Sequence, residues 1–180
     1  KTVFKNGNVY EGEYVKGKRE GYGTYTFPDG EKYEGQWFQD QQHGKGIYYF
    51  MNNNRYDGMW FQDYQQGKGT MYYYTGDIYE GDWVNDKREG QGTYTWKNGS
   101  KYEGSWKNDK KEGKGTFVWN DGCKYEGDWK NDVRDGKGTF EYANGDKYVG
   151  DWKDDMQHGK GIYFFHTGDR YEGAYVQGER

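Results

Sequence analysis

The feature that most constrains this chain is a short motif that recurs at a fixed period of 23 residues. Each copy begins with a tyrosine, which is followed by a glycine two positions later and by an aromatic residue four positions later. The eight tyrosines are Tyr10, Tyr33, Tyr56, Tyr79, Tyr102, Tyr125, Tyr148 and Tyr171. A fixed period between about 20 and 50 residues is typical of repeat proteins, whose units bury surface against their neighbours. We therefore expect a linear array.

The period also defines the expected domain organisation. We predict one array over residues 1–180, in which partial repeats at 1–9 and 171–180 flank seven full repeats. The full repeats cover residues 10–32, 33–55, 56–78, 79–101, 102–124, 125–147 and 148–170. Because the chain opens and closes inside a repeat, we expect it to be a fragment of a longer array.

Composition narrows the function classes. Aromatic residues make up 21% of the chain, and each can bury roughly 150–250 Å², so aromatic rings can supply the core. The net charge of −4 is spread over interspersed acidic and basic residues. We expect no nucleic-acid binding, because that requires a basic patch or stripe. Cys123 is the only cysteine, which indicates a reducing, cytoplasmic location.

Each repeat alternates aromatic or glycine residues with polar residues at a period of two, as over residues 79–84 and 90–97. This pattern is typical of strands with one apolar face. We predict a four-residue loop at 85–88 and a hairpin turn at each Asn-Gly or Asp-Gly pair. The predicted fold is all-β: a single-layer antiparallel β-meander solenoid with one hairpin per repeat, forming an elongated, curved and twisted rod.

A four-residue loop also fixes a strand register. In this register Trp83 would face Gly90 within its own repeat, and Gly92 would face Trp106 of the next repeat. Each indole would then lie over glycine on both neighbouring strands, as in aromatic rescue of glycine. We therefore expect a Cβ at Gly92 to displace two tryptophan rings.

The pattern Tyr-Glu-Gly-x-Trp, followed by Gly-x-Gly-Thr-Tyr and an Asn-Gly or Asp-Gly turn, resembles the MORN repeat (membrane occupation and recognition nexus) over essentially the whole chain. The resemblance implies a curved single-layer β-solenoid. It also implies the roles of MORN proteins: scaffolds of the protist cytoskeleton and of axonemes, membrane junctions, and targeting modules beside enzyme domains. Phosphoinositide binding is a further activity proposed for the family. We expect association with a cortical or axonemal cytoskeleton.

Groups that could carry catalysis are dispersed. His43 and His158 lie five repeats apart, and Cys123 has no histidine near it in sequence, so neither a metal site within the chain nor a cysteine nucleophile is expected. The Gly-Lys-Gly triplets lack the helix that a phosphate-binding loop requires. We expect no enzyme activity and no cofactor. A metal bridged between two chains stays open as an alternative.

Apolar residues at normally polar positions mark two candidate contact surfaces on the face opposite the glycines. An apolar patch on a thin sheet often marks a contact surface, and an exposed edge strand needs a cover. The first patch, expected to bind a partner protein, comprises Phe38, Ile47, Tyr49, Met59, Phe61 and Tyr72. The second, expected to seat a dimer partner or a capping element at the end of the array, comprises Val149, Ile162, Phe164, Ala174 and Val176. The same register would place Ile47 opposite Met59 and Ile162 opposite Ala174.

Two further surfaces are candidates. The aromatic face of a curved sheet could hold a helix or an extended peptide lengthwise; its residues are Tyr33, Trp37, Tyr56, Trp60, Tyr79, Trp83, Tyr102, Trp106, Tyr125 and Trp129. A lysine row could attract anionic lipid headgroups, although nearby aspartates would dilute its potential; it comprises Lys45, Lys68, Lys114, Lys137 and Lys160.

These patterns favour a non-catalytic repeat scaffold that binds protein partners, self-associates as a homodimer and contributes to cytoskeletal organisation. The alternative is a membrane-targeting module that binds phosphoinositide or phosphatidic acid. An accessory module of an enzyme encoded outside this sequence also stays open.

Overall fold

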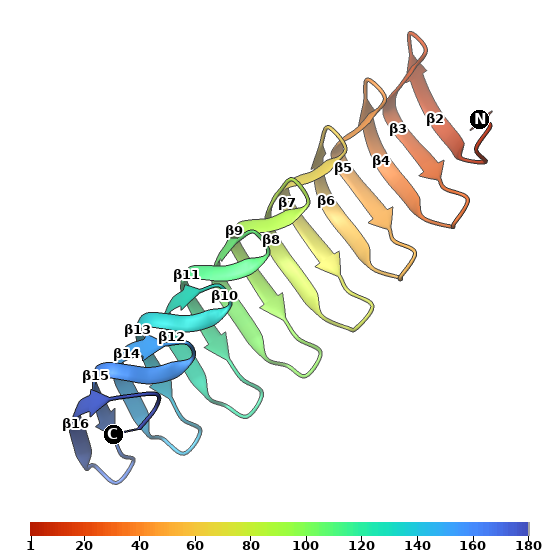
Figure 1. The fold of residues 1–180 in the computed structure, drawn as a ribbon. Helices are drawn as coiled ribbons and strands as arrows, with labels where there is room; N and C mark the ends of the chain where they lie inside the picture. The colour runs from red at the N-terminus through yellow and green to blue at the C-terminus, as the bar shows by residue number, and fades with distance from the viewer. Residues whose placement is uncertain (180) are drawn as a thin grey trace. The chain divides into compact units, whose positions relative to one another are not determined.

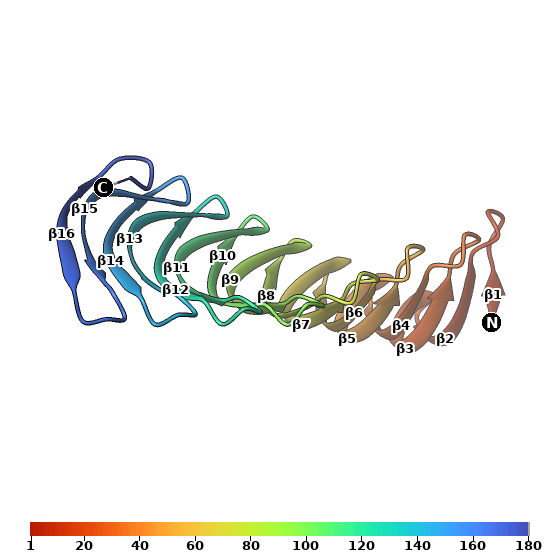
Figure 2. The same ribbon diagram turned by 90° about the horizontal axis from the view of Figure 1, so that it is seen from below.

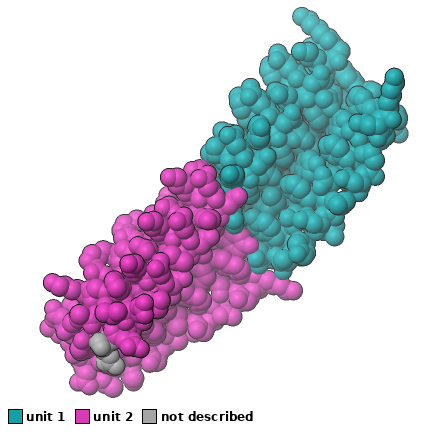
Figure 3. Space-filling model, in the orientation of Figure 1, with its two compact units in different colours: residues 1–88 teal, residues 89–180 magenta. Residues whose placement is uncertain are grey.

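The computed structural model describes residues 1–179, which form 16 strands and, within that range, no helix (Figure 1). The strands fall into two compact units, residues 1–88 and residues 89–180 (Figure 3). The first unit contains β1 (Thr2–Val3), β2 (Val9–Val15), β3 (Lys18–Thr26), β4 (Lys32–Phe38), β5 (Gln41–Tyr49), β6 (Arg55–Phe61), β7 (Tyr64–Tyr72) and β8 (Ile78–Val84). The second contains β9 (Lys87–Thr95), most of which lies beyond residue 88, β10 (Lys101–Lys107), β11 (Lys110–Val118), β12 (Lys124–Lys130), β13 (Val133–Glu141), β14 (Lys147–Lys153), β15 (Met156–Phe164) and β16 (Arg170–Tyr175).

Within each unit every strand pairs antiparallel with the strands next to it in sequence (Figures 1 and 2). Hairpin connections join successive strands, so that each 23-residue repeat contributes one short and one longer strand. The sheet of each unit is a single layer. The prediction of an all-β antiparallel meander with one hairpin per repeat is confirmed.

The core of each unit is a line of aromatic rings on one face of the sheet. The side chain of Tyr33 is fully buried, and it contacts two tryptophans edge to face: Trp37 of its own repeat, at 5.2 Å between ring centroids, and Trp60 of the next, at 5.4 Å. Such edge-to-face pairs add about 0.5–1.5 kcal/mol beyond area burial. The tryptophan four positions after each such tyrosine also donates to a glycine carbonyl on the preceding strand, as Trp37 Nε1 does to Gly23 O at 3.1 Å. The tyrosine and tryptophan of one repeat therefore link it to the next.

The rings that lie on bare backbone are the tyrosines, which corrects the expectation for the tryptophans. The Tyr102 ring covers Gly115 on the adjacent strand, where an added Cβ would overlap the phenol. Gly104 in turn packs against the Cα of Gly115. The paired glycines are therefore required by the close approach of the tyrosine and of the two strands.

The loop inside each repeat is shorter than predicted. Between β10 and β11 the turn is two residues, Asn108 and Asp109, whose φ angles are 49° and 68°. Positive φ at both central residues suits the type I′ hairpin turn, which matches the twist of the strands, and Asn and Asp tolerate this conformation better than most residues. The predicted four-residue loop at 85–88 is wrong because its last two residues, Lys87 and Arg88, belong to strand β9.

The register differs from the expected one on both sides of the tryptophan, at the two-residue turn and at the five-residue connection 96–100 between β9 and β10. Trp106 pairs with Lys111 across the hairpin, after a register shift that follows the Gly104–Gly115 pair. On the other side it pairs with Gly90, while Gly92 pairs with Gly104. The expected opposition of Gly92 and Trp106 is therefore wrong, although the Trp106 indole still donates to Gly92 O at 3.1 Å.

Candidate functional site

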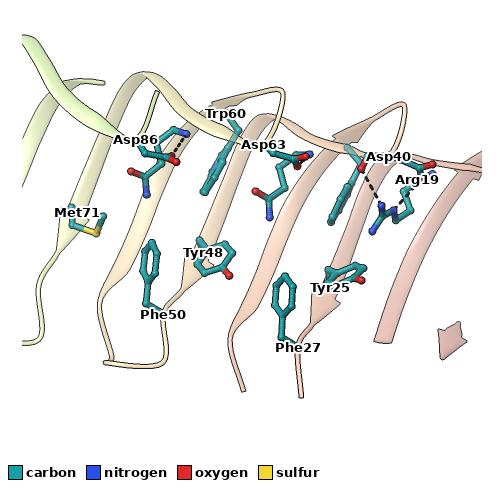
Figure 4. Close-up of a pocket in the computed structure, with 13 residues that line it drawn as sticks. Arg19, Tyr25, Phe27, Asp40, Tyr48, Phe50, Trp60, Asp63, Met71 and Asp86 are labelled. Carbon is teal, nitrogen blue, oxygen red and sulfur yellow. Dashed lines mark hydrogen bonds and ion pairs between the residues drawn. The ribbon is translucent and has the colours of Figure 1, made fainter. Parts of the chain in front are cut away.

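The aromatic face of the first unit contains an open groove with a volume of about 630 Å³ (Figure 4). Its floor and walls come mainly from the longer strands β3, β5 and β7 and from the turns that follow and precede them. The lining residues are Arg19, Tyr25, Phe27, Trp37, Asp40, Gln42, Tyr48, Phe50, Trp60, Asp63, Gln65, Met71 and Asp86.

One wall of the groove is aromatic (Figure 4). Tyr25 contacts Phe27 at 4.9 Å between centroids, Phe27 lies 6.3 Å from Tyr48, and Tyr48 contacts Phe50 at 4.6 Å. All four rings are half-buried, so each keeps a surface open to the groove. These residues were not among the expected groove residues, although aromatic residues recur 15 and 17 positions after the first tyrosine of most repeats.

The opposite wall is acidic. Asp40, Asp63 and Asp86 each occupy the second position of a two-residue turn (Figure 4). Each carboxylate accepts a 2.8 Å hydrogen bond from a backbone N–H one repeat earlier, as Asp63 Oδ1 does from Gln42. The N–H of Arg19, helped by the guanidinium, holds the pKa of Asp40 below its usual value. The groove therefore has a row of negative charge facing a row of rings.

A cation lies between the two walls only at the first of these positions. The Arg19 guanidinium packs over Trp37, 4.6 Å from the centre of the ring, and its Nε lies 3.0 Å from Asp40 Oδ1. One and two repeats further on, Gln42 and Gln65 occupy the place of Arg19. In the groove they replace a charged side chain with a neutral one.

The side chains of the two glutamines are mostly buried, but their amide atoms stay accessible from the groove. Their exposed fractions are 8% and 4%, and among residues 1–179 neither side-chain amide forms a hydrogen bond. In the same range Asp63 and Asp86 form no ion pair. The groove thus offers accessible amide groups and unneutralised carboxylates beside Trp60.

Two of the corresponding positions in the second unit hold cations. Arg134 lies over Trp152 at 4.7 Å, with its Nε 3.1 Å from Asp155 Oδ1. Lys111 lies over Trp129 at 5.1 Å and 4.0 Å from Asp132. A third position holds the neutral Gln157, which pairs with Trp152. Its Nε2 donates to the Tyr142 hydroxyl at 2.9 Å, a hydrogen bond with no counterpart among the described residues at Gln42 and Gln65.

The structure places the aromatic residues expected to line a groove in the core instead. Of that set, Tyr33, Tyr56, Tyr79, Tyr102 and Tyr125 are fully buried, and Trp37, Trp60, Trp83, Trp106 and Trp129 are at most 5% exposed. Only parts of Trp37 and Trp60 reach the groove of the first unit.

The first apolar patch lies on the outer face, where charged residues separate its members. Ile47 pairs with Asp57 and not with Met59, whose partner is Lys45. The expected contact is wrong because the connection between β5 and β6 spans five residues, 50–54, so that Tyr49 pairs with Arg55. Tyr49 is covered by the Lys32 ammonium at 4.7 Å and Tyr72 by the Arg55 guanidinium at 4.2 Å. Phe38 and Phe61 are brought together through one ring, that of His43, at 5.5 Å and 5.4 Å.

The second patch surrounds a shallow hollow on the outer face of the last strands. Val149 pairs with Ile162, but Ala174 pairs with Lys160. The expected opposition of Ile162 and Ala174 is wrong because the connection between β15 and β16 spans five residues, 165–169. Phe164 pairs with Arg170, and Val176, beyond the end of β16, is 64% exposed.

Three members of the lysine row are neutralised on the outer face by aspartates of the adjacent strand. Their ion pairs are Lys68–Asp82, Lys114–Asp128 and Lys137–Asp151. Lys45 and Lys160 instead lie opposite Met59 and Ala174. The row is therefore not a continuous positive strip.

Metal-binding and reactive groups are dispersed in the structure. Within residues 1–179 there is no group of three His, Cys, Asp or Glu residues placed to hold a metal ion. Burial is the main factor that raises the pKa of the Cys123 thiol, which disfavours the nucleophilic thiolate. Over the same residues, no helix has the length and apolar character needed to cross a membrane.

An open antiparallel meander built from 23-residue hairpins, with an aromatic core and a groove on the core face, defines a β-repeat array. A family model described as "MORN repeat" matches residues 10–32, 33–55, 56–78, 79–101, 102–124, 125–147 and 148–170. The chain belongs to the MORN-repeat family. A comparison with curated proteins gives no match.

Solved structures with a similar fold include domains of the protein CPAP. The TCP domain of Drosophila melanogaster SAS-4 (dCPAP), in complex with a proline-rich motif of Ana2 (dSTIL), is 15% identical with a TM-score of 0.51, over 86% of this chain and 85% of that chain. The TCP10 domain of Danio rerio CPAP in complex with a STIL peptide is 15% identical with a TM-score of 0.55, over 93% and 74% of the two chains. The same domain alone gives 14% and 0.56, over 96% and 82%. At these identities the likeness concerns the fold.

Proposed function

We propose that this chain is a non-catalytic repeat scaffold, and that the groove of the first unit binds a polypeptide segment of another protein. The observation that carries the proposal is the pairing of the aromatic wall of Tyr25, Phe27, Tyr48 and Phe50 with the acidic wall of Asp40, Asp63 and Asp86. Accessible aromatic rings supply binding energy, and flanking charges give specificity. A long groove of this kind suits a chain bound lengthwise.

Two considerations favour a polypeptide over a lipid as the ligand. The neutralised pairs Lys68–Asp82, Lys114–Asp128 and Lys137–Asp151 weaken attraction to an anionic membrane. The CPAP domains, which share the fold, are solved with a proline-rich motif and with a peptide bound. A cytoskeletal setting for the scaffold follows from the roles that MORN-repeat proteins have elsewhere.

We further propose self-association through the end of the second unit. The exposed Val176 and the hollow beside Ile162 supply apolar surface there. A symmetric dimer would cover both.

Selection from a random peptide library against the whole chain tests the groove. We expect the selected peptides to bind the unmodified protein and to lose about tenfold or more in affinity for Phe50→Ser, because the aromatic wall loses an anchor. The control is Phe61→Ser, the same change at a half-exposed ring on the outer face. Recovery of no peptides, or peptides that depend on Phe61 and not on Phe50, would show that the groove is not the docking surface.

A further inference from the structure

We propose that the groove of the first unit takes a basic polypeptide segment in the polyproline II conformation, with arginine side chains three residues apart. These side chains would occupy the two places where Gln42 and Gln65 stand instead of a cation. The inference rests on the proposed function and adds the chemistry of the partner.

The chain itself shows which group fits between the two walls. Arg19 and Arg134 each pack on a tryptophan, at 4.6 Å and 4.7 Å from the ring centre, while reaching an aspartate of the neighbouring turn at 3.0 Å and 3.1 Å. A guanidinium satisfies both contacts because it is planar and carries several donors. The same combination of ring and carboxylate recurs beside Gln42, in Trp60 and Asp63.

The two glutamine positions have unmet binding capacity. The side chains of Gln42 and Gln65 are more than nine-tenths buried, line the groove and form no hydrogen bond of their amides within residues 1–179. Their amide atoms are accessible from the groove, so a ligand can form hydrogen bonds with them. Asp63 and Asp86 likewise keep unneutralised charge beside them. A donor-rich cation with a backbone carbonyl nearby would satisfy both the carboxylates and the amides.

Spacing selects the conformation of the segment. Successive repeats are two strands apart, roughly 9.6 Å. A polyproline II helix rises about 3.1 Å per residue with three residues per turn, so residues i and i+3 lie about 9.3 Å apart on the same face. In a β-strand, residues i and i+3 point to opposite faces. The pyrrolidine rings between the arginines would then lie against Phe27, Tyr48 and Phe50, as prolines do in other aromatic grooves.

The test uses a fluorescein-labelled peptide of repeated Arg-Pro-Pro triplets and the whole chain. We expect the protein to bind this peptide about tenfold or more tightly than a Glu-Pro-Pro peptide and than an Arg-Pro-Pro-Pro peptide, in which the spacing is wrong. Gln42→Arg and Gln65→Arg should each weaken binding about fivefold or more, because a cation of the chain then fills the site. Added salt should weaken binding as well.

The matched control is Gln41→Arg, which adds the same charge one residue away on the exposed outer face of β5. We expect it to change the affinity by less than about twofold. Equal weakening by Gln41→Arg and Gln42→Arg would overturn the proposal, because it would show only a dependence on net charge. Absence of binding by the unmodified chain, or equal affinity for the two arginine spacings, would overturn it too.

The selected library peptides distinguish a groove that binds a different segment from a groove that binds no segment. If selected library peptides depend on Phe50 but are neither basic nor sensitive to Gln42→Arg, the groove is a docking site for a different segment. The thermal melting of each variant shows that it is folded before its affinity is compared.

Discussion

The Tyr102 hydroxyl donates a 2.8 Å hydrogen bond to the carbonyl oxygen of Ser105, three residues further along the same strand. This bond holds the phenol ring flat over Gly115 of the next strand. The same bond recurs from Tyr33 to Gln36 at 2.7 Å and from Tyr148 to Asp151 at 2.8 Å. The fixed spacing of tyrosine and glycine in the repeat is therefore a consequence of one packing unit.

Gly115→Ala should lower the free energy of unfolding by about 3 kcal/mol, because the new Cβ overlaps the buried Tyr102 ring. The expected fall in Tm is roughly 6–12 °C. Glu103→Ala, at an exposed side chain on the opposite face of β10, should change stability by less than about 0.5 kcal/mol. If the Gly115→Ala variant had the same Tm as the unmodified protein, the Tyr102 ring would not require a glycine beneath it.

Stability should fall steeply above pH 10. Burial raises the pKa of Tyr148 to about 12 and also raises the pKa of Tyr33, Tyr56 and Tyr102. Because an unfolded tyrosine ionises near pH 10, the unfolded state binds fewer protons from pH 10 upwards. Each such tyrosine then lowers the free energy of unfolding by about 1.4 kcal/mol per pH unit, until the pH reaches the pKa that the tyrosine has in the folded state.

Urea unfolding at several pH values, together with the absorbance of phenolate, checks this dependence. Tyr148→Phe should reduce the slope of unfolding free energy against pH by about the share of one tyrosine. It should also lose about 1 kcal/mol at neutral pH, because the hydrogen bond to Asp151 O is gone. A pH-independent unfolding free energy between 10 and 12 would contradict burial as the cause.

Gln42→Arg should stabilise the chain by about 0.5–1 kcal/mol, since the new guanidinium would find Trp60 and Asp63 as Arg19 finds Trp37 and Asp40. Stabilising substitutions that cost function are common at binding sites.

The reverse substitution, from a cation to glutamine, can be made in the second unit. Arg134→Gln removes a cation that is 18% exposed, over Trp152 and beside Asp155, and should cost about 1 kcal/mol. Chemical denaturation measures the free energy of unfolding of both variants, Gln42→Arg and Arg134→Gln. Destabilisation by Gln42→Arg would mean that the groove has no room for a cation at that position.

Phe164→Glu and Val176→Glu should convert a dimer to a monomer if the end of the second unit is an interface, because a carboxylate would be buried without a partner. Light scattering measures the mass, and Phe38→Glu, at a half-exposed ring of the first unit, is the control. An unchanged oligomeric state in both variants would exclude this interface.

The sequence pattern predicted the strands well because the 23-residue repeat, the period-two alternation and the glycine turns all indicate one meander. It could not separate a four-residue loop from a two-residue turn at Asn85 and Asp86, since both have polar residues there. The structure's turn requires positive φ at both positions, 47° and 69°, which Asn and Asp tolerate. The expected partners of Ile47 and Ile162 were shifted by a second difference, the five-residue connections at 50–54 and 165–169.

The sequence pattern assigned the groove to the first-strand tyrosines and tryptophans, whereas other residues of the aromatic face line most of the groove in the structure. Repetition of the first-strand tyrosines and tryptophans made them conspicuous, yet the residues repeated most strictly form the core, as the fully buried Tyr56 does. The wall comes from Tyr48 and Phe50, which vary between aromatic types from repeat to repeat. The signal at Gln42 and Gln65 is a departure from the basic residues at the same offset, and only the structure shows that this offset lies over Trp60.

The strictly sequential pairing of strands within each unit has a consequence for how the chain is assembled. No contact inside a hairpin requires residues far apart in sequence, and local contacts of this kind are fast to form. If one more 23-residue repeat were inserted after residue 124, the strands at its two ends would pair with the same kinds of strand that the existing repeats pair with. Repeats can therefore be added to or removed from such an array, by evolution or by design, without changes to the remaining repeats.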